Sequence, residues 1–292
     1  MVPLKFALIG GDGRAGRLGA LLARDGHRVQ SFALEKAERR DGVTRAGSLQ
    51  GCVYGADWVL LGMPAEKKGL LNTPLAVQEL SLGELISVMW PGQVLCGGGL
   101  SQESRLAAVR AGLTVCDLLA RRDFSVGNAA VTAEGAIGLL LQNGERCLWG
   151  SHVLVTGWGR IASLLAPRLR ALGAYVTAAA RKPGDRAMAE AMGLGSCAPE
   201  QLELMLEDVD FLVNTVPAPL LDEGLLRRMK PGALLLELAS EPGFDRERAE
   251  ALGLRTRYAP GLPGRSAPET AAALMRDTIY AVIREREEND GG

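Results

Sequence analysis

Residues 152–182 read HVLVTGWGRIASLLAPRLRALGAYVTAAARK. A short apolar run leads into a glycine turn, a helical pattern follows, and a second apolar run ends beside Arg181. Short apolar strands that alternate with helices are typical of a parallel sheet covered on both faces. The stretch therefore predicts a β-α-β unit, the repeating element of a doubly wound α/β fold.

The same alternation occurs in two successive halves of the chain. Short apolar runs lie at 4–10, 28–34, 58–63, 93–96 and 113–118, and again at 152–157, 175–180, 211–216, 233–239 and 255–259. We predict two tandem doubly wound parallel-sheet (Rossmann-like) domains with an interdomain cleft. Residues 1–127 would form the substrate-side domain and residues 128–292 the NADP-binding domain. An interdomain helix is expected near 131–143 and a C-terminal helix near 268–287.

The bulk composition is that of a globular chain. It has 292 residues, a formal net charge of −1, 47% hydrophobic and 23% charged residues. Such a balance gives no electrostatic reason to expect nucleic acid or a membrane as a partner. We count no apolar stretch of the roughly 18–20 residues that a membrane span needs. The N-terminus enters a strand directly and the cysteines are scattered, so we expect a cytoplasmic protein without a signal peptide.

The glycine turn at 157–162, GWGRIA, has the G-x-G-x-x-A form of the dinucleotide fingerprint. The first glycine permits the tight turn, the second admits the pyrophosphate, and the alanine lets the helix pack on the strand. A tight turn without a ligand is the alternative. The predicted cofactor-binding residues of this turn are Gly157, Trp158, Gly159, Arg160 and Ile161.

Arg181 and Lys182 follow the second strand of this unit. An NAD site usually has an acidic residue there, which binds the ribose 2′-hydroxyl but would repel a 2′-phosphate. Arginine pairs with phosphate, so the two cations predict NADP. NAD stays open if the pair is only a solvated strand end.

A second turn at 11–16, GDGRAG, matches G-x-G-x-x-G letter for letter. Asp12, however, places a negative charge where a phosphate would lie. A dehydrogenase of two domains also needs only one cofactor. We therefore expect this turn to face the substrate, with a nucleotide in the first domain as the alternative.

Three motifs in the second half carry a resemblance. They are NTVP at 214–217, LASEPG at 238–243 and APGLPGRSAPETAA at 259–272, preceded by Asp123, Asn128 and TAEG at 132–135. In this order they resemble the family of dipicolinate synthase A subunits over nearly the whole chain, and the cofactor half is similar to D-isomer 2-hydroxyacid dehydrogenases. Two positions depart from the family: Arg121 replaces an acidic residue, and Gly243 is followed by Phe244 rather than a second glycine.

The resemblance implies an oxidoreductase that forms dipicolinate (pyridine-2,6-dicarboxylate). The reaction would be NADP-dependent dehydrogenation of dihydrodipicolinate or of its hydroxylated tetrahydro precursor. It further implies a dicarboxylate substrate and, as partner, the B subunit of dipicolinate synthase. The location it implies is the mother cell of a sporulating bacterium, and a homo-oligomer is possible. The residues it assigns are Asn128 and Thr132 on the substrate side, and Thr215, Val216, Pro217, Ala239 and Ser240 on the cofactor side.

Dehydrogenation to a pyridine ring needs a base for the proton that leaves with the hydride. Both histidines, His27 and His152, stand at strand starts, away from the strand ends where ligands gather. We therefore predict a carboxylate base, Glu134 or Asp123. The lack of a suitably placed histidine argues against a 2-hydroxyacid dehydrogenase.

Substrate carboxylates need cations or N–H groups, and loops must close the site. The predicted substrate-binding residues are Arg122, Arg121, Gly98 and Ser101, the last two from the CGGGLS turn at 96–101. The loop residues predicted beside the nicotinamide are Pro260, Gly261, Leu262 and Pro263. We predict no metal site. The alternatives are an NAD(P)-dependent hydroxy- or amino-acid dehydrogenase and a non-catalytic nucleotide-binding regulatory subunit.

Overall fold

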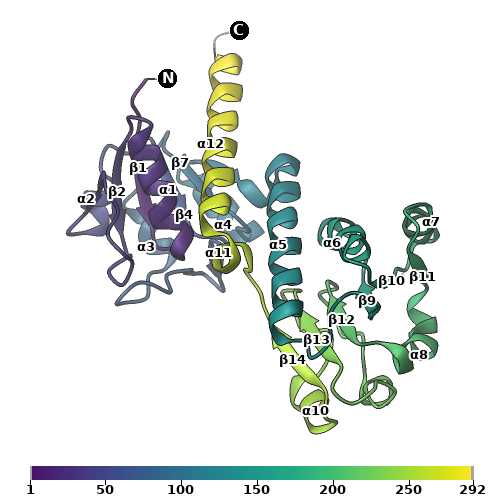
Figure 1. The fold of residues 1–292 in the computed structure, drawn as a ribbon. Coiled ribbons are helices and arrows are strands. Elements are labelled where there is room, and N and C mark those ends of the chain that lie inside the picture. Colours follow the sequence, from purple (N-terminus) through teal and green to yellow (C-terminus); the bar gives the residue numbers. More distant parts are fainter. Residues whose placement is uncertain (1, 291–292) are drawn as a thin grey trace. The chain divides into compact units, whose positions relative to one another are not determined.

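The structure, a computed structural model, describes residues 2–290 of the chain (Figure 1). The chain divides into two units, of which the first combines Met1–Asn128 with Pro263–Gly292 and the second comprises Ala129–Leu262. Each unit contains one six-stranded parallel sheet. The predicted α/β fold class, with two doubly wound sheets, is confirmed.

The sheet of the first unit has the strand order β3-β2-β1-β4-β7-β8. Its strands are β1 (Lys5–Ile9), β2 (Arg28–Phe32), β3 (Val43–Arg45), β4 (Trp58–Leu61), β7 (Val94–Gly97) and β8 (Thr114–Asp117). A separate antiparallel pair is formed by β5 (Glu66–Lys67) and β6 (Leu70–Leu71). The helices of this unit are α1 (Gly13–Arg24), α2 (Leu49–Val53), α3 (Leu82–Ser87), α4 (Gln102–Arg110), the 3₁₀ turn η1 (Leu118–Ala120), α11 (Pro263–Ser266) and α12 (Pro268–Asp290).

The sheet of the second unit has the equivalent order β11-β10-β9-β12-β13-β14. Its strands are β9 (His152–Thr156), β10 (Tyr175–Ala179), β11 (Gly195–Cys197), β12 (Phe211–Asn214), β13 (Leu234–Glu237) and β14 (Arg255–Tyr258). Its helices are α6 (Arg160–Ala171), α7 (Pro183–Ala191), α8 (Leu202–Met205), α9 (Glu223–Leu226) and α10 (Arg246–Ala251), with the 3₁₀ turns η2 (Pro199–Gln201) and η3 (Leu206–Asp208). Helix α5 (Arg122–Asn143) begins in the first unit and continues into the second.

Both faces of each sheet are buried, as the fully apolar strands predict. In β1, Phe6 and Leu8 belong to one core, while Ala7 and Ile9 belong to the core on the opposite face. In the second unit, successive residues of β9 likewise alternate between two cores. This alternation has the period of two that a pleated strand imposes.

The C-terminal helix corrects the predicted domain limits. The boundary predicted at residue 127 lies within one residue of the observed one, but the last part of the chain packs in the first unit, not the second. One side of α12 (Ala272, Met275, Ile279 and Ile283) completes the core beside α1 (Figure 1). Arg17 Nε also lies 2.7 Å from Glu269 Oε1. The assignment to the second domain was wrong because it followed chain order, whereas α12 packs where an apolar face needs cover.

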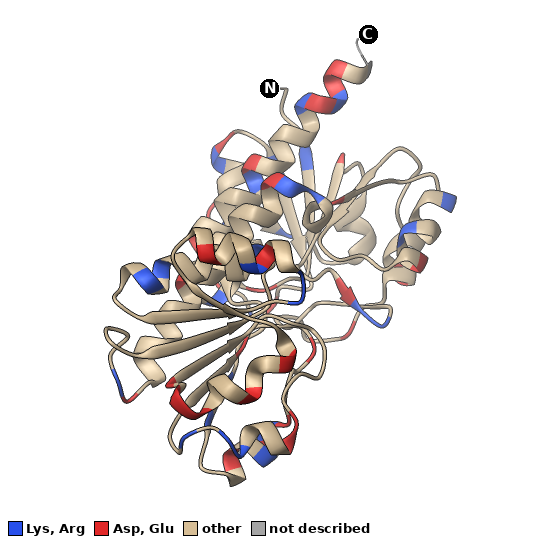
Figure 2. Ribbon diagram, turned by 90° about the vertical axis from the view of Figure 1, so that its right-hand side faces the viewer, with Lys and Arg blue, Asp and Glu red and all other residues tan. Residues whose placement is uncertain are grey.

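Helix α5 is longer than the predicted 131–143 segment. Contrary to our count, it is long and apolar enough to cross a membrane by length and composition. Half of that window is buried, and its apolar side chains serve protein cores: Phe124 in one unit, Ala133, Ala136 and Leu140 in the other. In the view of Figure 2, acidic and basic segments are interspersed over both units.

Candidate cofactor and active site

The glycine turn after β9 is open toward solvent. Gly157 has φ +91°, and a Cβ there would lie 2.6 Å from Thr215 Oγ1, so the turn requires glycine. Gly159 precedes the first residue of α6, whose N-terminus has no side-chain cap. A Cβ on Gly159 would meet nothing within 4 Å. Uncapped N–H groups beside empty space suit the pyrophosphate of a dinucleotide.

A pocket of about 630 Å³ lies at this turn and at the carboxyl ends of β10 and β12. Its volume is within the usual range for small-molecule sites. Eight predicted cofactor residues line it: Gly157, Trp158, Gly159, Arg181, Lys182, Thr215, Val216 and Pro217. Sequence reasoning missed the other lining residues: Ala179, Ala180, Asp185, Pro199, Leu202, Ala218, Pro219 and Leu220. Pro199 and Leu202 reach the pocket only through the fold, whereas the others lie close to predicted residues in the sequence.

The other predicted cofactor residues do not line this pocket. Ile161 packs against the core, and Ala239 and Leu262 are buried. Pro263 begins α11 and belongs to the first unit. Leu262 and Pro263 are both buried, and their contact with a cofactor stays a prediction. Contact of a cofactor with the remaining residues stays a prediction: Arg160, Ser240, Pro260 and Gly261.

Arg181 stands at one end of the pocket, on a turn held in place by Arg186. The Arg186 Nη1 group donates to the carbonyl oxygens of Ala180 and Arg181, both at 2.8 Å. Arg181 and Lys182 are exposed, and no side chain caps the start of α7, which immediately follows. Asp185 is the single carboxylate in the lining. Two cations and an uncapped helix start outweigh it as partners for an anion.

A buried polar network joins three strand ends beneath the pocket. Thr156 Oγ1 donates to Asn214 Oδ1 at 2.5 Å, and Asn214 Nδ2 donates to Glu237 at 2.8 and 2.9 Å. The Glu237 carboxylate also accepts from the N–H groups of Ala239 (2.9 Å) and Gly243 (2.8 Å). Burial raises the pKa of Glu237, while these donors favour its charged form. The network holds the 238–243 loop at the carboxyl edge of the sheet.

The first glycine turn is occupied by the protein itself. The Asp12 carboxylate caps α1 by accepting from the Arg14 N–H at 3.0 Å, and it pairs with the Arg14 guanidinium at 2.7 Å. Arg14 is 4% exposed. Above the turn, Gly11 N donates to Asn72 O at 2.8 Å, and a Cβ on Gly10 would lie 2.4 Å from Thr73 Cγ2. A carboxylate therefore takes the place that phosphate would need.

The predicted substrate arginines differ in their surroundings. The guanidinium of Arg121 pairs with Asp123 and with Glu285, each at 2.7 Å. The hydrogen bonds from Arg121 hold the pKa of Asp123 below its ordinary value. Because its pKa is lowered, Asp123 is a weaker base. Because its guanidinium already pairs with two carboxylates, Arg121 is less available to bind a substrate carboxylate.

Arg122 and Glu134 are exposed on α5, and neither side chain has a hydrogen-bond or ionic partner among residues 2–290. On the same helix Asn128 is half-buried and Thr132 is buried. The structure therefore leaves one predicted carboxylate and one predicted arginine available for a ligand.

The CGGGLS turn has a structural role. Gly99 N donates to Asp117 Oδ1 at 3.1 Å, and Ser101 N donates to Glu66 Oε1 at 2.9 Å. Ser101 Oγ caps α4 by accepting from Ser104 N. A Cβ on Gly98 would lie 2.7 Å from Met63 Cγ. The N–H groups of Gly99 and Ser101 already have carboxylate partners, and substrate binding by Gly98 and Ser101 stays a prediction.

Neither histidine lies at a strand carboxyl end. His27 Nδ1 accepts from Leu4 N at 3.1 Å, and burial lowers the pKa of this imidazole. His152 is exposed beside Tyr175. Both positions agree with the prediction that the histidines stand at strand starts, away from the strand ends where ligands gather. Among residues 2–290 no group of three or more His, Cys, Asp or Glu could hold a metal ion, and the five cysteines are free.

The matching family models define the class of protein. Residues 5–119 match the N-terminal domain of the dipicolinate synthase A subunit. Residues 120–248 match the D-isomer specific 2-hydroxyacid dehydrogenase NAD-binding domain. With the open glycine turn and its pocket, this makes the chain an oxidoreductase that uses a nicotinamide cofactor.

Similarity to one family extends over nearly the whole chain. The dipicolinate synthase A subunit of Bacillus subtilis is 29% identical, over 99% of this chain and 98% of its own. The crystal structure of the corresponding protein from Bacillus halodurans has a TM-score of 0.85 at 26% identity, covering 97% of this chain and 98% of that one. D-lactate dehydrogenase from Escherichia coli, at 14% identity and a TM-score of 0.63 over 98% of both chains, shares the fold. The resemblance to the family of dipicolinate synthase A subunits is confirmed.

The two glycine turns offer a matched pair of substitutions. Gly159→Val should strongly weaken dinucleotide binding, because the side chain enters the open space before α6 without meeting the protein. Losing phosphate hydrogen bonds worth about 3 kcal/mol predicts an affinity loss of about 100-fold. Gly13→Val, at the equivalent place in the other turn, should leave affinity unchanged. Isothermal titration with NADP and NAD measures both, and an equal loss in the two variants would contradict a single cofactor turn.

Glu237→Gln should lower the free energy of unfolding by about 1–3 kcal/mol. The amide nitrogen replaces one acceptor oxygen, so one buried donor of the network loses its partner. Urea denaturation measures the change. Glu241→Gln, an exposed glutamate of the same loop, is the control and should be within about 0.5 kcal/mol of the parent. Equal stabilities of the two variants would mean that the network does not hold the loop.

Proposed function

We propose that the protein forms dipicolinate by NADP-dependent dehydrogenation of dihydrodipicolinate or of its hydroxylated tetrahydro precursor, which must also lose one water molecule. The observation that carries the proposal is the open glycine-turn pocket with Arg181 and Lys182 at its rim, in a chain similar throughout to the A subunit of dipicolinate synthase. The name of that relative supports a B subunit of the same enzyme as partner, and sporulation as the setting. We place the protein in the cytoplasm of the mother cell, and a homo-oligomer stays open.

NADP is favoured over NAD by the charges around the pocket end. A 2′-phosphate there would meet Arg181, Lys182 and the uncapped start of α7, against the single carboxylate of Asp185. A charge-assisted hydrogen bond contributes roughly 1.5–3 kcal/mol. Since about 1.4 kcal/mol is tenfold in affinity, Arg181 gives a ten- to hundredfold preference for NADP.

The chemistry requires hydride and proton to leave the ring together. When bound, the nicotinamide supplies the hydride acceptor. Glu134 takes the ring proton, because its exposed carboxylate is unpaired among the described residues, whereas Asp123 is held by Arg121. Arg122 binds a substrate carboxylate through its guanidinium. Aromatisation drives the reaction, so a carboxylate of ordinary strength suffices.

The rival functions predict different behaviour of the purified chain. With dihydrodipicolinate, formation of NADPH by the chain, either by itself or with its partner, supports the proposal. Turnover of a hydroxy or amino acid instead would make it another dehydrogenase. Cofactor binding without turnover in any mixture would make it a regulatory protein. The absence of a histidine at the described strand ends disfavours the hydroxyacid reaction.

Arg181→Ala should weaken NADP binding ten- to hundredfold and leave NAD binding nearly unchanged. The lost guanidinium contacts only the 2′-phosphate, which NAD lacks. Titration of both cofactors into both proteins measures this. Arg284→Ala, which removes an exposed arginine of α12, controls for total charge. Equal affinities of the wild type for NAD and NADP would show that Arg181 is only a solvated strand end.

Glu134→Gln should lower kcat about 100-fold or more with little change in NADP affinity, because general-base catalysis typically contributes that much. Asp123→Asn is the comparison, and its main effect should be a loss of stability through the freed Arg121. Steady-state kinetics in the presence of the partner and a cofactor titration separate the two effects. Full activity in both variants would show that neither carboxylate is the base.

A further inference from the structure

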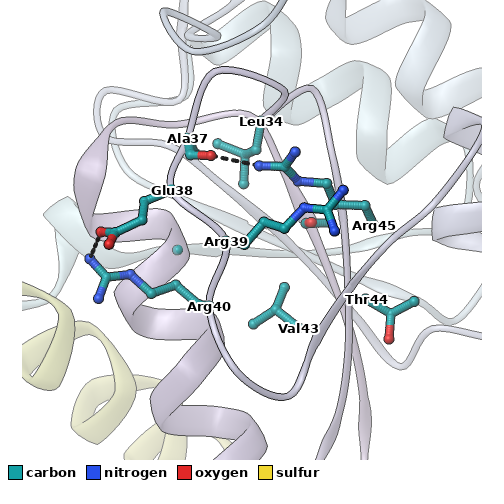
Figure 3. Close-up of a pocket in the computed structure, with 10 residues that line it drawn as sticks. Leu34, Ala37, Glu38, Arg39, Arg40, Val43, Thr44 and Arg45 are labelled. Atoms are coloured by element: carbon teal, nitrogen blue, oxygen red, sulfur yellow. Dashed lines mark hydrogen bonds and ion pairs between the residues drawn. The ribbon is translucent and has the colours of Figure 1, made fainter.

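The two units differ in the connection between the second and third strands of their sheets. In the second unit α7 connects β10 to β11, and its Ala189 packs in the same core as Ala166 and Leu169 of α6. In the first unit no helix connects β2 to β3, and residues 33–42 form a loop. A hollow of about 350 Å³ remains between this loop, the two strands and α1 at Gly16 (Figure 3). We name it the β2–β3 pocket.

The β2–β3 pocket is positively charged. Arg39, Arg40 and Arg45 line it together with one carboxylate, Glu38, which pairs with Arg40 at 2.7 Å (Figure 3). Arg45 Nη2 donates to the carbonyl oxygen of Ala37 at 2.6 Å, so its charge is not neutralised. Arg39 has no ionic or hydrogen-bond partner among residues 2–290. Two guanidinium charges therefore remain uncompensated at one small hollow.

A hydroxyl in the pocket lining supports a ligand independently of these charges. Ser31 of β2 lines the pocket and is 3% exposed. Its Oγ makes no hydrogen bond within residues 2–290. The Oγ atom is not among the buried side-chain atoms that lack a partner, so it is open to the pocket, where a hydroxyl can donate to or accept from a ligand. A ligand oxygen in the pocket would supply the missing partner.

The remaining lining gives the chemical class. Leu34, Ala37 and Val43 form an apolar wall, while Ser31 and the arginines supply polar donors. This combination suits a small molecule with an apolar body and two negative charges. Arginine binds carboxylate and phosphate alike, so both chemistries fit.

We propose that the β2–β3 pocket is a binding site for a small organic dianion, which carries its charge on carboxylate or phosphate groups. The site lies in the first unit and uses none of the residues of the cofactor pocket. Two sources share this chemistry, an aromatic dicarboxylate and an organic phosphate monoester.

Calorimetric titration of the NADP-saturated full chain tests the site. The probes are pyridine-2,6-dicarboxylate and phenyl phosphate, with the monoanion pyridine-2-carboxylate for comparison. The variants are the double variant Arg39→Ala with Arg45→Ala and the single variant Ser31→Ala. The control is Arg110→Ala, which removes an exposed arginine of α4. We expect at least one dianion to bind the wild type, about tenfold or more weaker binding to the double variant, and no change in the control.

Ser31→Ala makes the test specific to the pocket. Because the hydroxyl has no partner in the protein, its removal should leave the melting temperature unchanged yet weaken the dianion about two- to tenfold. The proposal is overturned if neither dianion binds the wild type, if the double variant binds as the wild type does, or if Arg110→Ala loses affinity equally. Tighter binding of one probe than of the other shows whether the ligand is an aromatic dicarboxylate or an organic phosphate monoester. If the wild-type chain binds a dianion in this pocket but forms no NADPH from dihydrodipicolinate, the proposed function is contradicted and this site is not.

Discussion

The buried carboxylate of Glu237 organises the carboxyl edge of the sheet in the second unit, where the cofactor pocket lies. It is 2% exposed and accepts hydrogen bonds from Asn214 and from the N–H groups of Ala239 and Gly243. Asn214 in turn joins it to Thr156, next to the glycine turn. Buried polar groups are tolerated only when they are satisfied, so the ends of three strands and one loop are held as a set. Any ligand at this edge meets a surface that is already organised.

The two glycine turns share one sequence pattern, but one is closed by a side chain of the protein and the other is open. Each follows a buried strand and opens a helix, but Asp12 fills the first, while the second has Trp158 at the equivalent place and stays open. The pattern of glycines alone could not distinguish them. The acidic side chain inside the first turn was the visible signal, because a carboxylate competes with phosphate for the same N–H groups.

Local patterns predicted most of the fold, and contacts distant in sequence account for the rest. All ten apolar runs correspond to strands, whereas β3 and β11, three residues long and partly exposed, gave no such pattern. The place of α12 depends on which apolar face needs cover, which no local window reports. At the candidate site, the glycine turn and Arg181 were readable, but Pro199 and Leu202 reach the pocket only through the fold. The ion pair of Arg121 with Glu285 could not be predicted, because the two residues are distant in sequence.

The closed first turn also explains why the units are not interchangeable. Arg14 is buried, and its charge is matched by Asp12 and by the carbonyl oxygen of Met63. A Cβ on Gly264 of α11 would lie 2.5 Å from Asp12 Oδ2, so this pair is also covered. Removing Asp12 would leave the buried charge of Arg14 uncompensated, but the Asp12 side chain is 31% exposed, so the cost lies below the roughly 3–5 kcal/mol of a fully buried ion pair. A substitution at Asp12 that opens this turn for phosphate therefore also costs stability, and this supports our proposal that the cofactor binds in the second unit.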